Sequence, residues 1–98
     1  MITVLIERHI APGMASTYNN FARKMLQATV SAPGFISGES LHGIEDQNVR
    51  YILIKMQSRE NWQDWLASAE RREVVSLLSS ILVLPEKITL LSHGGQAG

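Results

Sequence analysis

The hydrophobic residues of the chain follow two different periods, and the order of those periods limits the fold more than any other feature. Residues 1–9 alternate as in a strand, with Ile2, Val4 and Ile6 on one face. Residues 14–29 carry apolar side chains at steps of three and four, which predicts a helix. Strand patterns follow at 35–44 and 49–57, helical spacing from 59 to 84, and a last strand at 87–92.

Turn-forming residues separate these segments. Ala11-Pro12-Gly13 ends the first strand, and Pro33-Gly34 closes the first helix. The polar residues 45–48 predict a hairpin, while Ser58 is expected to cap the second helix and Pro85 to stop it. The order strand, helix, strand, strand, helix, strand predicts an α+β, ferredoxin-like βαββαβ fold. In this fold a four-stranded antiparallel sheet carries two helices on one face.

Apolar side chains on both faces of two predicted strands, 2–6 and 49–56, predict a partner for the sheet face without helices. A second copy, packed sheet to sheet with two-fold symmetry, is the simplest candidate. The segment 74–84 and the last strand are expected to contribute to this homodimer. Residues 1–93 are expected to form one domain, and residues 94–98 a flexible C-terminal tail.

Composition argues against several classes of function. Nine Lys and Arg balance nine Asp and Glu, so no basic excess exists for nucleic acid or an anionic membrane surface. The absence of cysteine excludes disulfides, thiol nucleophiles and cysteine-ligated metals. No apolar run approaches the ~20 residues that span a bilayer, and residues 1–9 do not resemble a signal peptide. A soluble cytoplasmic protein is therefore predicted.

The βαββαβ order, Pro33-Gly34-Phe35, the hairpin at 36–57 and the segment SRENWQDWLAS at 58–68 together resemble a known family. They are similar to the antibiotic-biosynthesis monooxygenase domain of the dimeric α+β barrel superfamily, over about residues 1–93. The resemblance implies a homodimer whose two sheets form a barrel, with a pocket between the helices and sheet of each subunit. Some members oxidise polycyclic aromatic or quinol substrates with O2, without metal or flavin, whereas others degrade haem.

Trp65 and Asn61 are the first candidate site residues. In similar proteins a Trp at this helix position lines the pocket, and Asn61 lies one helical turn earlier. The amide can bond a ring oxygen of a phenol or quinone, while the indole supplies a flat apolar surface. The structural alternative is that Trp62 and Trp65 both anchor the core. Because they are three residues apart, one of them is expected at the edge of the core.

Arg8 and His9 are the candidates for a charged or proton-accepting group in the site. Arg8 extends the apolar face of the first strand, where it can bind an acidic substrate group or a quinone oxygen. The alternative is a salt bridge, for which Glu39 is a candidate partner. His9 can act as a general base, since imidazole titrates near neutral pH, or it can be a plain strand-end residue. The hydroxyls of Tyr18 and Tyr51 can hydrogen-bond a ligand, but both are expected at the surface.

Haem degradation and metal binding find little support in the residues. Haem-degrading relatives place an Asn on the first strand and an iron-ligating His after the Trp. This chain has Ile-Glu-Arg at residues 6–8, and Val75 near the position of that His. The three histidines are spread over three predicted strands and lack metal-ligand spacing. No cofactor and no metal are therefore predicted.

The leading hypothesis is a small cofactor-independent monooxygenase that oxidises an aromatic phenol, hydroquinone or polyketide-like compound with O2. Asn61 and Trp65 would position the substrate, and Arg8 or His9 would supply charge. One alternative is a non-catalytic dimeric module that binds a small ligand, and a weaker one is a haem-binding protein. The pocket distinguishes the monooxygenase from the binding module, because a pocket that Trp62 and Trp65 fill completely argues against catalysis.

Overall fold

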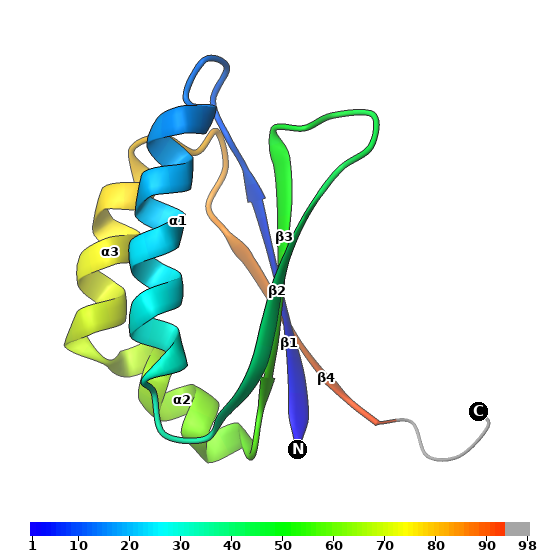
Figure 1. Cartoon of the computed structure of the whole chain (residues 1–98), viewed down its shortest axis with the longest axis vertical. Helices are drawn as coiled ribbons and strands as arrows, with labels where there is room; N and C mark the ends of the chain where they lie inside the picture. The colour runs from blue at the N-terminus through cyan, green and yellow to red at the C-terminus, as the bar shows by residue number, and fades with distance from the viewer. Residues whose placement is uncertain (94–98) are drawn as a thin grey trace.

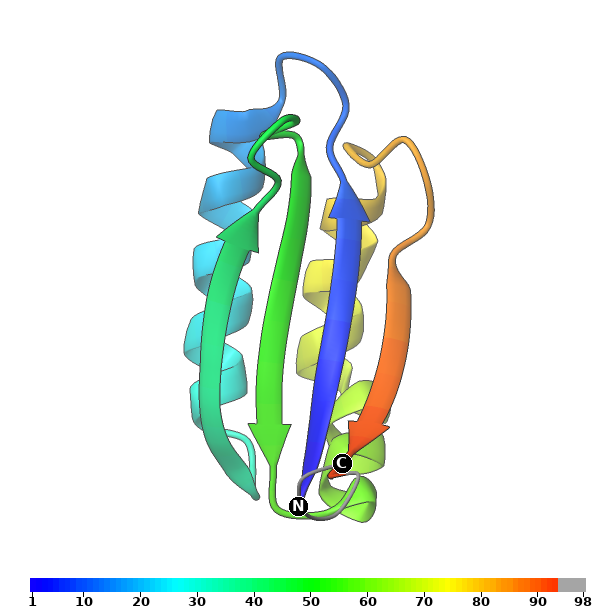
Figure 2. The same ribbon diagram turned by 90° about the vertical axis from the view of Figure 1, so that its right-hand side faces the viewer.

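The computed structural model describes residues 1–93 and has the predicted βαββαβ order, with the second helical region divided in two (Figure 1). The strands are β1 (Ile2–His9), β2 (Phe35–His42), β3 (Val49–Met56) and β4 (Lys87–Ser92). The helices are α1 (Ala15–Val30), α2 (Arg59–Ala67) and α3 (Ala69–Ser79). The strands form one antiparallel sheet in the order β2-β3-β1-β4 (Figure 2). The ferredoxin-like prediction is therefore confirmed.

Ser68 divides the predicted second helix into α2 and α3. Its backbone is extended, with φ −67° and ψ 148°, so the helical path ends there. Its hydroxyl donates to the Trp65 carbonyl and accepts from the backbone N–H of Arg71, which closes one helix and caps the next. Ser58 caps α2 as predicted, because its Oγ accepts from the backbone N–H of Asn61.

Strand pairing assigns each side chain to a face of the sheet. Val4 and Ile6 pair with Ile54 and Ile52 of β3, and directly paired residues point to the same side. This side faces the three helices (Figure 1), and Arg8 continues it at the end of β1. The buried apolar core lies there and consists of Val4, Ile6, Ile10, Tyr18, Met25, Ile54, Met56, Trp62, Trp65, Leu78 and Ile81.

The opposite sheet face carries no helix in the part of the chain that the structure describes (Figures 1 and 2). Leu5 pairs with Leu53 on this face. Leu41 and Leu91, which alternate with the core positions of their strands, are 46% and 43% exposed. Apolar residues thus occur on both faces, as the sequence predicted, while the dimer itself stays a prediction.

Two further predictions concern the ends and the environment of the chain. The tail predicted at residues 94–98 lies outside the described residues. Between residues 1 and 93, no helix has the length and apolar character needed to cross a membrane.

Candidate functional site

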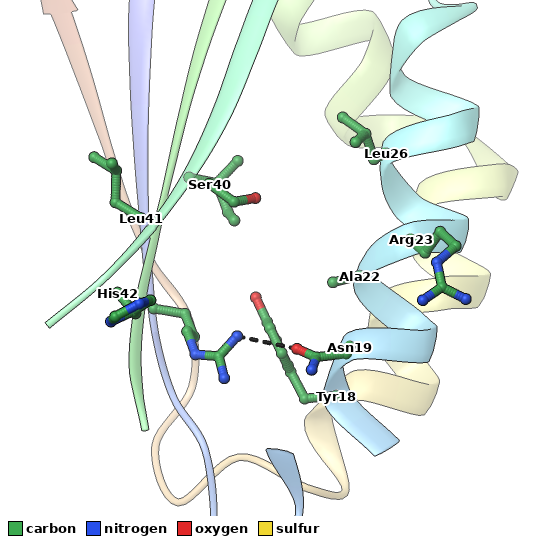
Figure 3. Close-up of a pocket in the computed structure, with 10 residues that line it drawn as sticks. Tyr18, Asn19, Ala22, Arg23, Leu26, Ser40, Leu41 and His42 are labelled. Carbon is green, nitrogen blue, oxygen red and sulfur yellow. Dashed lines mark hydrogen bonds between the residues drawn. The ribbon is translucent and has the colours of Figure 1, made fainter. Parts of the chain in front are cut away.

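A cavity of about 310 Å³ lies between α1 and the strands β2 and β3 (Figure 3). This volume is at the lower end of the range for small-molecule sites, roughly 300–1,000 Å³. Both apolar and polar side chains from the helix and the sheet line it. Its lining consists of Tyr18, Asn19, Ala22, Arg23 and Leu26 from α1, Ser40, Leu41 and His42 from β2, and Arg50 and Ile52 from β3.

A smaller inner space of about 30 Å³ adjoins this cavity and shares Ala22, Leu26, Ser40 and Ile52 with it. That volume is roughly the share of one water molecule in the liquid. The other residues around the inner space come from β1, α1, β3 and the two later helices, and all of them are buried. They are Ile6, Arg8, Met25, Thr29, Ile54, Trp65 and Arg71. The two tryptophans therefore do not fill the pocket.

A network of charged side chains supports the inner space. Glu86, in the connection between α3 and β4, accepts hydrogen bonds from Arg8 Nε at 3.0 Å and from Arg71 Nη2. Arg8 also donates from Nη1 to the hydroxyl of Tyr18 at 3.1 Å. Arg8 and Arg71 are only 2% and 5% exposed. Two guanidinium groups thus share one carboxylate in a region largely shielded from water.

The charge balance of this network favours anions. Burial alone would raise the pKa of Glu86, but the nearby charges and hydrogen bonds of Arg71 and Arg8 hold that pKa below its ordinary value. Glu86 is therefore ionised at neutral pH and cancels one of the two positive charges. The charge that remains stands beside an apolar space, where it stabilises a developing negative charge more strongly than it would in water.

Tyr18 is a functional candidate whose position the sequence patterns do not predict. Its hydroxyl was expected at the surface, and this is wrong, because the residue is 2% exposed and its oxygen accepts from Arg8. Its ring lies near two cations, with the guanidinium carbon of Arg50 at 5.3 Å and that of Arg8 at 5.9 Å from the ring centroid. Figure 3 shows the side chain reaching from α1 into the cavity. Since Arg8 occupies an acceptor site, the hydroxyl proton can be donated to a ligand.

The structure separates the two tryptophans of α2. Both belong to the buried core, but Trp65 is 6% exposed and lines the inner space, whereas Trp62 is 1% exposed and does not line it. The guanidinium carbon of Arg71 lies 5.8 Å from the centroid of the Trp62 ring. Trp65 is thus the tryptophan that contributes to the pocket wall.

Asn61 lies apart from this cavity, although it is one turn from Trp65. Its Oδ1 accepts from Ser58 Oγ at 2.8 Å, which ties it to the start of α2. It also packs against Gly34, whose φ is +85°, so closely that a Cβ on that glycine would lie 2.3 Å from Asn61 Cγ. Asn61 and Trp65 share a separate depression of about 190 Å³ beside the C-terminal end of α1. The structure therefore does not bring Asn61 to the inner space.

His9 lies on the helix-free face of the sheet and lines neither the cavity nor the inner space. Its Nε2 is 2.9 Å from Glu7 Oε2. Glu39 lies on the same face, paired with Leu53, so it does not reach Arg8, and the partner of Arg8 is Glu86. Of the two predicted charge candidates, only Arg8 lies at the inner space. Within residues 1–93, no cluster of three potential His, Asp or Glu metal ligands is present.

Comparisons with known proteins agree with this architecture. The structure of a conserved protein from Methanosarcina mazei Go1 has 18% sequence identity and a TM-score of 0.85, covering 91% of this chain and 88% of that one. Rv0793 from Mycobacterium tuberculosis has 15% identity and a TM-score of 0.87, covering 99% and 98%. SnoaB, a cofactor-independent oxygenase from Streptomyces nogalater, has 11% identity and a TM-score of 0.83, covering 98% and 96%. No curated protein matches the sequence.

Identities this low show a shared fold and nothing more specific. The match to a family model carries further, because it rests on the sequence itself. Residues 1–77 of the 98 match the model described as antibiotic biosynthesis monooxygenase. The chain therefore belongs to the antibiotic biosynthesis monooxygenase family.

Proposed function

We propose that this protein is a cofactor-independent monooxygenase that oxidises an aromatic phenol, hydroquinone or polyketide-like compound with O2. The observation that carries the proposal is the pair formed by Arg8 and Tyr18 at the inner end of an apolar-walled cavity. The pair supplies a positive charge and an O–H donor in one place. Family membership and the fold shared with SnoaB, a cofactor-independent oxygenase, support the reaction class.

The reaction can be written for an anthrone-type substrate, in which a methylene group joins two aryl rings. Transfer of one methylene proton to water gives an anion that is both a phenolate and a carbanion, and the carbanion donates an electron to O2. The resulting radical pair combines to form a C–O bond, and protonation gives a hydroperoxide on the former methylene carbon. Loss of water then leaves a ketone. The methylene group and O2 thus become a carbonyl group and water, with one oxygen atom from O2 in the product.

The residues of the cavity have separate roles in this scheme. The unbalanced positive charge of Arg8 and Arg71 lowers the pKa of the substrate and stabilises its anion. Tyr18 donates its O–H to the peroxide oxygen, and the indole of Trp65 supplies an apolar wall to the inner space, which the ring faces from the outer cavity. The inner space of about 30 Å³ is large enough for O2. Asn61 is a positioning residue, because it fixes the start of α2 against Gly34 one turn before Trp65.

Oxygen uptake with a panel of hydroquinones and anthrones tests the proposal. Tyr18→Phe removes only the hydroxyl, and the loss of one such donor is expected to lower kcat about 100-fold. Tyr51→Phe is the matched control, because Tyr51 lies on the helix-free face, and it should leave kcat unchanged. Trp65→Phe should raise KM more than it lowers kcat. Asn61→Ala should change both KM and kcat less than Trp65→Phe does. Ligand binding without oxygen uptake for any panel member would favour the non-catalytic binding module.

A homodimer is part of this proposal. The helix-free face presents Leu5, Leu53, Leu41 and Leu91, and the last two are almost half exposed. Apolar side chains on a sheet face are stabilised when a second apolar surface removes them from water. Two copies packed sheet to sheet satisfy that requirement with one interface, and they leave the cavity on the helix side of each sheet open.

A further inference from the structure

The arginines of the chain are concentrated around one cavity. Four of the six line the cavity or its inner space, and these are Arg8, Arg23, Arg50 and Arg71. None of the described lining residues is Asp or Glu, and Glu86 contacts two of these arginines without lining either space. With Glu86 counted, three positive charges remain in excess, although the formal net charge of the chain is zero. This concentration is therefore local, and it favours a negatively charged ligand.

Arg50 is the member of this group best placed to hold a ligand at the outer part of the cavity. Its Nε donates to the Gln47 carbonyl at 2.7 Å, and its Nη1 donates to Asn19 Oδ1 at 3.0 Å (Figure 3, dashed line). Its guanidinium lies over the ring of Tyr18. These contacts fix the planar group in advance, so little conformational entropy is lost when a ligand binds. No partner among residues 1–93 engages its Nη2, which leaves donor capacity for that ligand.

The volumes of the outer cavity and the inner space determine how a ligand is oriented. The inner space of about 30 Å³ has room for one small group, so an acidic substituent on a ring belongs in the outer cavity of about 310 Å³. A carboxylate suits the guanidinium there, because both groups are planar and charge-assisted N–H bonds to a carboxylate oxygen are strong. The walls between the two ends come from Ala22, Leu26 and Ile52, which suit a flat apolar ring.

We infer that the ligand of this cavity is an aromatic carboxylic acid, whose carboxylate binds Arg50 while its ring extends toward Arg8 and Tyr18. Arg23, an exposed residue of the cavity lining, adds long-range attraction. The inference depends on the proposed function in one respect only, the orientation of the ligand ring. If the protein is an oxygenase, the reacting oxygen on that ring faces Arg8. Binding of the acid itself requires no reaction, and it can be measured separately.

Calorimetric titration with 2-naphthoate and 2-naphthamide tests this inference, because the two probes share a shape and differ in charge. We expect naphthoate to bind at least about tenfold more tightly at low salt, with an advantage that shrinks as ionic strength rises. Arg50→Gln should weaken naphthoate binding about tenfold and leave naphthamide unchanged, and Arg50→Lys should fall between. Arg59→Gln is the matched control, because it removes the same charge from an exposed position of α2 outside the cavity.

Equal affinity for the two probes, binding of neither, or equal losses in Arg50→Gln and Arg59→Gln would each overturn the inference. Oxygen uptake, measured in parallel with a neutral hydroquinone and with a dihydroxynaphthoate, keeps this result distinct from the proposed function. Uptake with the neutral compound and no preference for naphthoate would reject the acidic ligand alone. A clear preference for naphthoate with no uptake for either compound would reject the oxygenase alone.

Discussion

Glu86→Gln is expected to destabilise the fold strongly, although residue 86 lies in a connection between α3 and β4. The substitution leaves Arg8 and Arg71, which are 2% and 5% exposed, without a carboxylate partner. Removing one partner of a buried ion pair lowers the free energy of unfolding by about 3–5 kcal/mol. The Glu86 side chain is 13% exposed and glutamine keeps one acceptor oxygen, so we expect the lower end of that range, about 3 kcal/mol. The corresponding fall in Tm is about 12 °C or more.

The pH dependence of this loss identifies its electrostatic origin. The pKa of Glu86 is lowered in the folded state, so the carboxylate contributes its stability above the unfolded pKa, near 4.5, and loses it as the pH falls through the folded value. The difference in unfolding free energy between wild type and Glu86→Gln should therefore be full at pH 7 and shrink below pH 4.5. Urea unfolding followed by tryptophan fluorescence measures this difference.

The control for this experiment is Glu73→Gln, an exposed position of α3, where we expect a change within about 0.5 kcal/mol. A loss below about 1 kcal/mol for Glu86→Gln would contradict the assigned network. A loss that stays constant between neutral and acidic pH would show that packing, and not charge, causes it.

Two other predictions concern the turn after α1 and the helix-free sheet face. Gly34→Ala should lose more stability in urea than Gly13→Ala, because both have positive φ but only at Gly34 would a Cβ collide with Asn61; equal losses would argue against that contact. Light scattering should give twice 10.9 kDa for the wild type. Leu53→Lys should shift this mass toward the monomer, whereas Val30→Lys, at an exposed position of α1, should not; a monomeric wild type would reject the dimer.

The hydrophobic periods of the sequence were sufficient to predict the order of elements and the face on which Arg8 lies. Alternation along β1 places Arg8 with Val4 and Ile6, and strand pairing keeps it there. The interruption at Ser68 was not predicted, because helical spacing resumes at Val74 after a polar stretch that looks like the exposed side of one helix. The signal for this interruption is Ser68, which stands two residues before Glu70. A serine at the N-cap and a glutamate in the first turn are typical of the start of a helix.

The partners within the site were beyond the reach of sequence patterns. Glu86 is 78 residues from Arg8 in the chain, and only the path of the connection after α3 brings them together. Asn61 and Trp65 have the spacing of one helical turn, but the rotation of α2 decides which of them reaches the inner space. Tyr18 belongs to the apolar face of α1, and its hydroxyl becomes functional only through Arg8, on a strand that packs beneath it.

The most direct test of the central claim is mass spectrometry of the product formed from an anthrone under ¹⁸O2, with protein shown to be free of metal and flavin. We expect one ¹⁸O atom in each product molecule, formed at a rate that Tyr18→Phe lowers and Tyr51→Phe does not. Product that carries oxygen only from water, or product formed at the same rate by the wild type and Tyr18→Phe, would contradict it.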